Sequence, residues 1–232
     1  MKVVILQSNY IPWKGYFDLI NDADIFVFYD CVKYTKNDWR NRNKIYTKNG
    51  LQWLTIPISS NATKQLIEEV DIDNGNWQNL HYNSLFYGYR KAPFFYQLEE
   101  LLEIYLVNNR WVKLSNLNQF LIKLISEKIG IKTVFRQAND FEMKGNKIEK
   151  LLSILNSIGA SEYISGKAAQ SYLFGSETMF NDYNIQLTYK EYPNYPVYRQ
   201  LSSNFEQSVS ILDMIANIDW SEINSYIWNY ER

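Results

Sequence analysis

The sequence predicts an α/β fold with a mostly parallel, Rossmann-like sheet, a β-hairpin and a helical lobe. Three observations carry this prediction. A strand, a short helix and a second strand fit within the first 30 residues, which is the order of a βαβ unit with parallel strands. An Asn-Gly pair separates two further strand-like runs and indicates a hairpin. Amphipathic segments between residues 76 and 130 indicate helices that pack on one another.

The first unit begins with the apolar run 3–6, and its second strand is the run 25–29. Both runs are short and lack alternation, as expected of buried parallel strands. Between them, Pro12 breaks the chain direction and precedes the helix. Ligands collect at the carboxyl ends of parallel strands, so we expect the polar residues 7–10 and 30–36 to lie side by side.

The hairpin is expected over 44–58, with Asn49 and Gly50 in a type I′ turn, and residues 66–72 alternate enough to indicate another strand. Further strands are expected at 132–136, 162–165 and 185–191. The expected helices are 77–87, 93–107, 114–129, 147–158, 208–217 and 221–230. We expect a single domain over residues 1–232, with the helical lobe at about 76–130.

Composition excludes several classes of protein. The 232 residues are 46% hydrophobic and 21% charged with a net charge of −1, which indicates a globular chain without general affinity for nucleic acid. One cysteine, Cys31, and one histidine, His81, exclude an internal disulfide and a Cys- or His-rich metal site, so no metal is expected. No apolar run approaches the ~20 residues of a membrane span, and the N-terminus resembles a strand rather than a signal peptide. A cytoplasmic location is expected.

The stretch from Asp30 to Ile45 combines residue types that hold polar, often anionic, ligands. It supplies cations (Lys33, Lys36, Arg40, Arg42 and Lys44), flat aromatic faces (Tyr34 and Trp39) and amides (Asn37, Asn41 and Asn43). Guanidinium groups bind phosphate or carboxylate through two parallel hydrogen bonds. A solvated basic arm is the alternative interpretation, because runs of charge usually face water.

Three further features each have two interpretations. Ser165 and Gly166 follow a short strand and precede a helix start, where backbone N–H groups hold anions, but any strand–helix turn favours glycine. His81 shares a helix face with Trp77 and is either a core residue or a general base, since imidazole titrates near neutral pH. Cys31 is either a small buried side chain or a thiol whose pKa falls among cations and that carries an acyl group.

Several segments together resemble the WbqC-like family, over nearly the whole chain from Val3 to about Asn217. They are QSNYIPWKGYFDLI, ADIFVFYD, VKYTKNDWRNRNKI, NGLQWLTIPI, W-xxx-H at 77–81, GASEYISGKAAQSYL and SILDMI. The first block is the most specific: a strand, Q-x-N-Y-x-P-W-x-G-Y, and D-x-V-x-Y-x-K-x-x-W-x-N-R. The resemblance would place the site at Gln7, Asn9, Pro12, Trp13, Asp30, Lys36, Trp39, Asn41, Arg42, His81, Ser165 and Gly166.

Such proteins look like products of bacterial O-antigen, lipopolysaccharide and related surface-polysaccharide gene clusters. The resemblance implies transfer of a glycyl or another acyl group to an amino sugar, which we take to be linked to a nucleotide. In that reaction, Arg40, Arg42 and Lys36 would hold the sugar diphosphate. Trp13 and Trp39 would stack on the base or on the sugar.

An N-acyl transfer requires that the amine loses a proton and that the acyl carbonyl is polarised. We assign His81 as the general base, oriented by Asp30 if the two side chains approach. The implied acyl donor is a coenzyme A thioester (acyl-CoA), an acyl carrier protein, an aminoacyl-tRNA or an activated adenylate, and the sequence does not choose among them. No nucleic acid is expected as a partner unless the donor is a tRNA. There is no Walker A motif.

Three positions depart from the family pattern. Cys31 stands where an acidic residue is usual, Leu80 where a lysine often precedes the histidine, and Ile154 in a helix where a cysteine is common. These departures argue against a two-carboxylate metal site and against a nucleophilic cysteine in that helix. The alternative function is a non-catalytic sugar-nucleotide carrier or scaffold of the same pathway, which the many Tyr and Trp residues fit equally. A weaker analogy with nucleotidyltransferases lacks an H-x-G-H pair.

Overall fold

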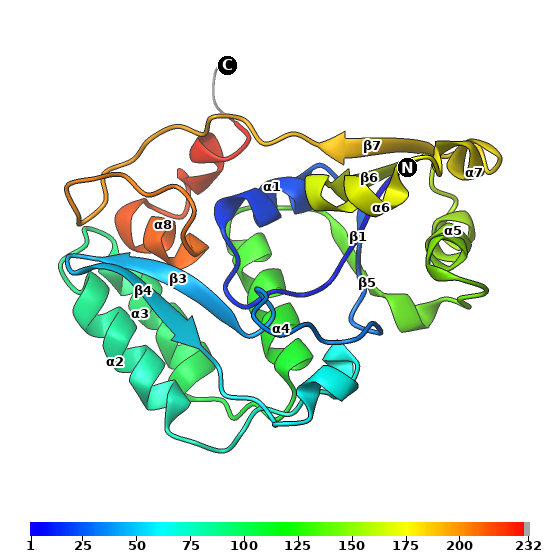
Figure 1. Ribbon diagram of the computed structural model, residues 1–232. Coiled ribbons are helices and arrows are strands. Elements are labelled where there is room, and N and C mark those ends of the chain that lie inside the picture. The colour runs from blue at the N-terminus through cyan, green and yellow to red at the C-terminus, as the bar shows by residue number, and fades with distance from the viewer. Residues whose placement is uncertain (230–232) are drawn as a thin grey trace.

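A computed structural model describes residues 1–229. Five parallel strands form its central sheet in the order β5-β2-β1-β6-β7 (Figure 1). The strands are β1 (Lys2–Leu6), β2 (Ile25–Phe28), β5 (Val134–Gln137), β6 (Glu162–Gly166) and β7 (Gln186–Lys190). Val3 pairs with Ile25 and Leu6 with Phe28, so the predicted βαβ unit is confirmed. The predicted α/β class with a mostly parallel sheet is confirmed as well.

The direction of the strand order reverses between β1 and β6. From β1 the chain adds β2 and then β5 on one side, and it later crosses β1 to add β6 and β7 on the other. Where two neighbouring parallel strands send their connections in opposite directions, a crevice opens at their carboxyl ends. In this sheet the crevice is expected beside Leu6 and Gly166, the last residues of β1 and β6.

Helices cover both faces of the sheet (Figure 1). On one face lie α1 (Lys14–Asn21), α4 (Leu114–Lys128) and α8 (Ile211–Asn217), and on the other α5 (Lys147–Ile158), α6 (Gln170–Leu173) and α7 (Glu177–Asn181). Successive strand residues point to opposite faces. Val4 and Phe26 therefore belong to the hydrophobic cluster under α1 and α4, whereas Val3 and Val27 belong to the cluster under α5.

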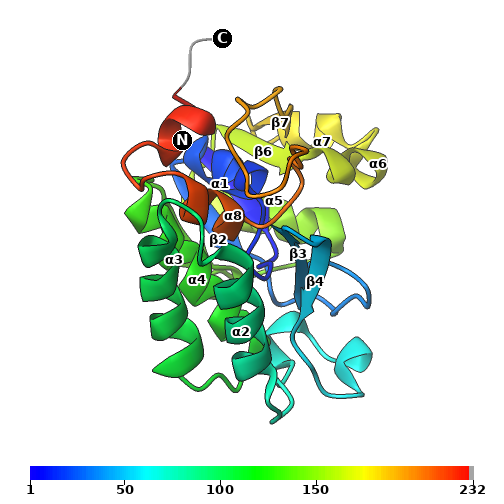
Figure 2. The same cartoon turned by 90° about the vertical axis from the view of Figure 1, so that its left-hand side faces the viewer.

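The helical lobe and the hairpin complete the fold. The lobe contains α2 (Trp77–Tyr89), α3 (Phe95–Leu102), a π-helical turn (Glu103–Val107) and α4, and the hairpin consists of β3 (Arg42–Thr47) and β4 (Gly50–Thr55). Figure 2 shows α2, α3 and α4 together, away from α6 and α7, and β3 packs against α2 and α8. Leu85, Leu98 and Leu121 of the lobe share one hydrophobic cluster with Val4 and Phe26 of the sheet, so the lobe packs directly on the sheet.

Two predicted elements are wrong because local hydrogen bonds form a tighter turn. Residues 66–72 contain a 3₁₀ turn, Ile67–Glu69, instead of a strand. The carboxylate of Glu69 accepts a hydrogen bond of 2.9 Å from the backbone N–H of Leu66 and closes this turn. The helix expected at 221–230 is a 3₁₀ turn at Ile223–Tyr226, and its last expected residue lies outside the described residues.

The hairpin turn also differs from the prediction. Thr47 pairs with Gly50, so Lys48 and Asn49 form the two-residue connection. Gly50 has a φ of 93°, but Asn49 is not in the left-handed region, whereas a type I′ turn needs two consecutive residues with positive φ. Among residues 1–229, no helix combines the length and apolar character needed to cross a bilayer.

A buried ion pair fastens the last strand of the sheet to α1. Nζ of Lys190 lies 2.9 Å from Oδ1 of Asp18 and 2.6 Å from Oδ2 of Asp22. The hydroxyl of Tyr195 donates to Oδ2 of Asp18 at 2.6 Å. The side chains of Lys190 and Asp18 are only 8% and 5% exposed, so loss of the Asp18 charge leaves the buried ammonium of Lys190 with its contact to Asp22 but without its more deeply buried partner.

We expect Asp18→Asn to lower the free energy of unfolding by about 3 kcal/mol in urea denaturation, because the ammonium of Lys190 then stays buried with one partner fewer. Glu100→Gln is the matched control. It removes a carboxylate 3.1 Å from Lys128 in an exposed pair, and it should cost less than about 1 kcal/mol. Equal small losses in both variants would contradict a stabilising role for the buried pair.

Candidate functional site

A crevice of about 610 Å³ opens at the carboxyl ends of β1, β2 and β6, where the strand order reverses. The residues expected at the site that line it are Gln7, Asn9, Trp13, Trp39, Arg40, Ser165 and Gly166. They come from three segments that are far apart in the sequence. The structure therefore brings together the polar residues that follow β1, β2 and β6 in the chain.

Arg40 is held at the junction of these segments. Its guanidinium donates to the side-chain oxygen of Asn9 and, at 3.2 Å, to Oε1 of Gln7. It also lies 3.5 Å from Oδ2 of Asp38, and the Arg40 side chain is 12% exposed. The buried Nε of Arg40 has no hydrogen-bond partner within the described residues. The crevice thus contains a fixed planar cation, the group best suited to a bidentate anion.

Asp38 is the carboxylate that faces this cation. Burial, the largest single effect, would raise the pKa of Asp38, but the Arg40 guanidinium and the hydrogen bonds to the carboxylate together outweigh it and hold the pKa below its usual range. Hydrogen bonds of 2.7 Å from the Thr35 hydroxyl and from the backbone N–H of Trp39 act in the same direction as Arg40. Asp38 is therefore ionised at neutral pH and paired with Arg40.

The turn that follows β1 is strained. Ile11 is fully buried and has a φ of 36°, a conformation that costs a β-branched residue about 1–3 kcal/mol. The amide of Asn43 stabilises it by donating to the carbonyls of Tyr10 (3.1 Å) and Ile11 (2.9 Å). The backbone N–H of Tyr10 donates to the carbonyl of Trp39 at 3.0 Å. These contacts fix the turn whose flanking residues, Asn9 and Trp13, line the crevice.

Aromatic rings form the walls near Arg40. The Trp13 ring lies 5.1 Å from that of Tyr192, which also lines the crevice. Trp39 stacks on Trp53 with ring centres 5.7 Å apart. On Trp53 lies the guanidinium of Arg42, 4.6 Å from the ring centre. Both Trp39 and Trp53 are more than 40% exposed, so the flat faces continue from the crevice onto the surface of the hairpin.

A second cavity of about 280 Å³ adjoins the crevice. Pro12, Asn43 and Ser208 line it, together with three residues that also line the crevice. The shared residues are Asn9, Trp13 and Trp39. Two compartments of different size therefore meet at the first turn of the chain.

An irregular segment, residues 191–210, contributes Tyr192 to the crevice and Ser208 to the smaller cavity. It is held by Lys14, whose ammonium lies 4.9–5.5 Å from three aromatic ring centres of the segment. The rings are those of Tyr195, Tyr198 and Phe205. Burial lowers the pKa of Lys14 to about 8, and Asp213 opposes this shift. Burial in turn raises the pKa of Asp213 to about 7.

Six residues expected at the site do not line the crevice: Pro12, which lines the smaller cavity, and Asp30, Lys36, Asn41, Arg42 and His81. Nδ1 of His81 lies 2.9 Å from the Tyr10 hydroxyl, and Nε2 lies 3.2 Å from the carbonyl of Thr55. A carbonyl can only accept, so Nε2 carries the proton and Nδ1 accepts from Tyr10. Burial lowers the pKa of His81 to about 4, opposed by the hydrogen bond to Thr55. Both ring nitrogens are therefore occupied at pH 7.

Asp30 supports the crevice from behind. Its Oδ1 accepts from the backbone N–H of Ser8 and its Oδ2 from the amide of Gln119, both at 2.8 Å. Burial raises the pKa of Asp30, and these hydrogen bonds and Arg40 oppose it. Tyr10 and Thr55, not Asp30, fix the ring of His81.

The other residues outside the crevice have structural contacts or face solvent. Asn41 is buried, accepts from the Tyr34 hydroxyl at 2.8 Å and donates to the carbonyl of Ile56 at 2.9 Å. Arg42 donates to the carbonyl of Asn37 at 2.5 Å. Lys36 is exposed. Two of the three cations expected to hold a diphosphate thus lie outside the crevice.

The environment of Cys31 disfavours the interpretation as a reactive thiol of lowered pKa. Burial raises the pKa of its thiol to about 11, and the charges of Glu68 and Asp30 add to the effect. Its Sγ lies 3.9 Å from Sδ of Met143. The raised pKa and the contact with Met143 support the interpretation of Cys31 as a structural side chain. Among residues 1–229, no group of three or more His, Cys, Asp or Glu side chains is arranged to hold a metal ion.

Two lysines that line the crevice, Lys147 and Lys167, were not expected at the site from the sequence. Lys33, which also lines it, belongs to the cationic stretch that the sequence identified. Behind the lining, Asn118 of α4 donates to the carbonyl of Arg40 at 2.8 Å, and an asparagine within the apolar stripe of a helix is a signal that could have found it. No local signal distinguishes Lys147 and Lys167 from the other lysines of the chain, because their direction depends on tertiary packing.

The single histidine allows a direct test of its burial. We expect its NMR titration to give a pKa of about 4, against about 6.5 for an exposed imidazole. A measured pKa near 6.5 would contradict a buried ring with both nitrogens hydrogen-bonded.

The same shift predicts how stability depends on pH. The unfolded chain binds a proton at His81 near pH 6.5 and the folded chain near 4, so the stabilisation is present above about pH 6.5 and is lost as pH falls towards 4. Asp213 acts in the opposite direction over an overlapping range. The effect is therefore measured as the difference in unfolding free energy between wild type and His81→Gln, which we expect to narrow by about 2–3 kcal/mol between about pH 7.5 and 4.5.

Gly15 allows the Trp13 ring to lie against the start of α1. A Cβ at Gly15 would stand 2.3 Å from an atom of that ring. Alanine normally stabilises a helix by about 1 kcal/mol over glycine, but we expect Gly15→Ala to lower the unfolding free energy by about 1–2 kcal/mol and to shift the tryptophan fluorescence. Gly75→Ala is the control, because its Cβ would meet no atom within 4 Å. A stabilised Gly15→Ala variant would contradict the contact.

Comparison with known proteins places the chain among related sequences. The model of the WbqC-like protein family matches residues 7–225. A protein of Mycobacterium tuberculosis called "Uncharacterized protein Rv1507c" is 40% identical over 218 residues, which are 94% of this chain and 94% of that protein. No solved structure matches the chain.

Proposed function

The chain belongs to the WbqC-like protein family, and we propose that it binds a nucleotide-linked amino sugar in the crevice and transfers an acyl group to the sugar amine. The acyl group would be glycyl or another aminoacyl or acyl group, and the product would enter O-antigen or another surface polysaccharide. The family resemblance supplies this reaction as an expectation. The geometry of the crevice supports the binding of a ligand that is both anionic and ring-shaped.

One observation carries the proposal. At the point where the strand order reverses, Arg40 is held by Asn9, Gln7 and Asp38 beside the ring of Trp13. A fixed guanidinium binds phosphate or carboxylate oxygens, and an aromatic face packs against a sugar or a base. Both kinds of contact are therefore available to one ligand, at the usual ligand position of an open α/β sheet.

The reaction needs few groups from the protein. The amine nitrogen attacks the acyl carbonyl carbon, the carbonyl oxygen takes up negative charge, and the donor's leaving group departs with its bonding electron pair. We assign to Arg40 the stabilisation of the developing negative charge. Asp38, ionised and in the crevice, is the acceptor that we assign to the proton released by the amine. His81 is not assigned this role here, because both its nitrogens are engaged in the core.

The two compartments suit two substrates of different size. The 610 Å³ crevice would take the sugar nucleotide, and the 280 Å³ cavity would take a short acyl group. The compartments share Asn9, Trp13 and Trp39, so the amine and the carbonyl would meet there. Acyl-CoA, an acyl carrier protein and an aminoacyl-tRNA remain the candidate donors.

A second candidate function is a non-catalytic sugar-nucleotide carrier or scaffold. The observation that favours it is the position of His81, which is buried, neutral and bonded to Tyr10 and Thr55. A binding protein needs no group that exchanges protons near neutral pH. The two candidates differ in whether the bound sugar is changed.

The test is to incubate the protein with UDP- or dTDP-amino sugars and each class of acyl donor, and to measure the product by mass spectrometry. We expect Asp38→Asn to lower kcat about 100-fold while sugar-nucleotide affinity changes less than about threefold. Arg40→Ala should lower kcat/KM about 100-fold or more. Asp182→Asn is the control. It removes an exposed carboxylate at the C-terminal cap of α7, and it should leave kcat and kcat/KM unchanged.

Each outcome of this test has a clear meaning. Full product formation by both Asp38→Asn and Arg40→Ala would overturn the proposed catalytic site. Tight binding of a sugar nucleotide without product from any donor would favour the carrier or scaffold. Failure of sugar nucleotides to bind at all would overturn both candidates.

A further inference from the structure

The crevice carries a charge opposite to that of the whole chain. Among the described residues, four cations line it, Lys33, Arg40, Lys147 and Lys167, and one carboxylate, that of Asp38, which is a formal net charge of +3. The complete chain has a net charge of −1. Arg40 lies 3.5 Å from Asp38, and the other three lining cations are the lysines. A crevice with apolar walls concentrates such a field on its contents.

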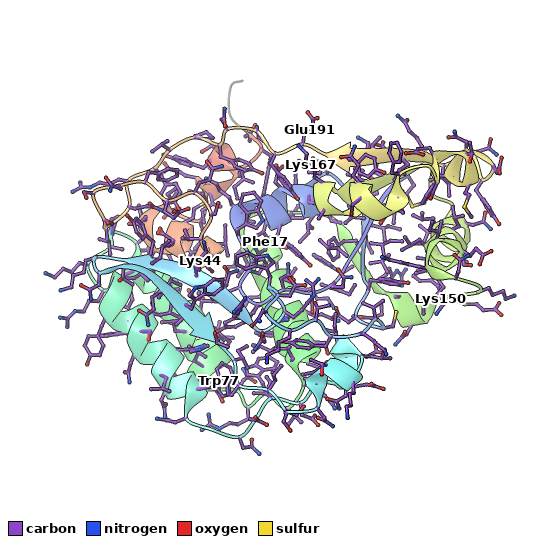
Figure 3. All side chains as sticks on the ribbon, in the orientation of Figure 1. Phe17, Lys44, Trp77, Lys150, Lys167 and Glu191 are labelled. Atoms are coloured by element: carbon purple, nitrogen blue, oxygen red, sulfur yellow. The ribbon has the colours of Figure 1, made fainter. Side chains whose placement is uncertain are left out.

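The three lysines come from separate segments that meet at the crevice. Lys33 follows β2, Lys167 follows β6, and these strands flank β1 on its two sides. Lys147 is the first residue of α5, which covers one face of the sheet. Ile148, next to Lys147, and Ala169, two residues after Lys167, pack in the hydrophobic cluster of that face, whereas Val32, next to Lys33, packs against the clusters of both faces. Figure 3 labels Lys167 where β6 leads into α6, above α1.

The side of the crevice towards α1 is lined by rings and one aliphatic side chain. Trp13, Tyr16 and Leu19 line it from α1 and the turn before it, and Tyr192 adds a further ring. Since α1 and α5 cover opposite faces of the sheet, the crevice runs over the sheet edge to the α5 side, where Tyr29 and Tyr163 line it together with Lys147 and Lys167. Arg40 is bonded to Gln7 and Asn9, which follow β1.

We propose that Lys33, Lys147 and Lys167 form a subsite for a diphosphate at the α5 side of the crevice. The ammonium of lysine binds phosphate as a point charge, and cations from three separate segments suit a ligand with several anionic oxygens. The start of α5 does not supply the subsite through its backbone, because the Asn146 side chain already accepts from the N–H groups of Ile148 and Glu149. The subsite is made by side chains.

This assignment rests on the proposed function and predicts how the substrate is oriented in the crevice. The phosphates of the nucleotide would lie between the lysines, and the amino sugar would point towards Trp13 and the smaller cavity. It replaces Lys36 and Arg42 as phosphate-binding residues, because Lys36 is exposed outside the crevice and Arg42 is bonded to Asn37.

The test measures binding of UDP and of inorganic pyrophosphate to the full chain by calorimetry at low salt. We expect Lys33→Gln, Lys147→Gln and Lys167→Gln each to weaken both ligands about fivefold, and the triple variant to weaken them about 100-fold. Affinity should fall as salt rises. Lys144→Gln is the control: it is three residues before Lys147, its side chain is 73% exposed and bonded to Glu142, and it should stay within about twofold of wild type.

The outcomes separate this inference from the proposed function. If the triple variant, folded by circular dichroism, binds UDP and pyrophosphate like wild type while Arg40→Ala loses UDP, the subsite is overturned and the proposed function stands. If wild type binds pyrophosphate in a lysine-dependent way but no nucleotide sugar, the subsite stands and the proposed function fails. Absence of pyrophosphate and UDP binding in wild type overturns the subsite.

Discussion

The guanidinium of Arg40 joins segments that lie 31 and 33 residues apart in the chain, since it donates to Asn9 and Gln7 after β1. Asp38, in the same loop as Arg40, pairs with the guanidinium. The amide of Asn118 in α4 donates to the backbone carbonyl of Arg40 at 2.8 Å. A half-buried cation needs such partners, because without them its desolvation would cost several kcal/mol. The arrangement of the crevice therefore depends on the same contacts that make Arg40 tolerable in the fold.

The fold also holds strain next to this cation. Ile11 keeps a φ of 36° because it is fully buried and because the amide of Asn43 donates to the carbonyls of Tyr10 and of Ile11 itself. A ligand site assembled from strained and buried polar groups is rigid before the ligand arrives. Rigid donors lose little entropy on binding, and they are more effective towards charge that develops during a reaction.

Much of the fold follows from local patterns, as the parallel pairing of β1 with β2 and the bounds of α5 show. The location of the site at strand ends follows as well, because the topology of a βαβ unit brings Gln7 and Arg40 to one edge. The direction of individual side chains does not follow. Lys33 and Lys36 are three residues apart in one loop, yet only Lys33 lines the crevice. The imidazole of His81 is the chemical type of a general base, but the packing of α2 on the hairpin places the ring in the core.

The charge of the crevice affects the proposed chemistry in a second way. An amine attacks a carbonyl only as the neutral base, and a nearby positive charge disfavours its protonated form. Arg40 and the lysines on the α5 side would therefore lower the pKa of an amine bound between them, besides holding the phosphates. The low pKa of Asp38 keeps its carboxylate ionised, so it is available to accept this weakly held proton. A buried, neutral His81 is compatible with catalysis on this account, because the field of the crevice, rather than a base that titrates near pH 7, would prepare the nucleophile.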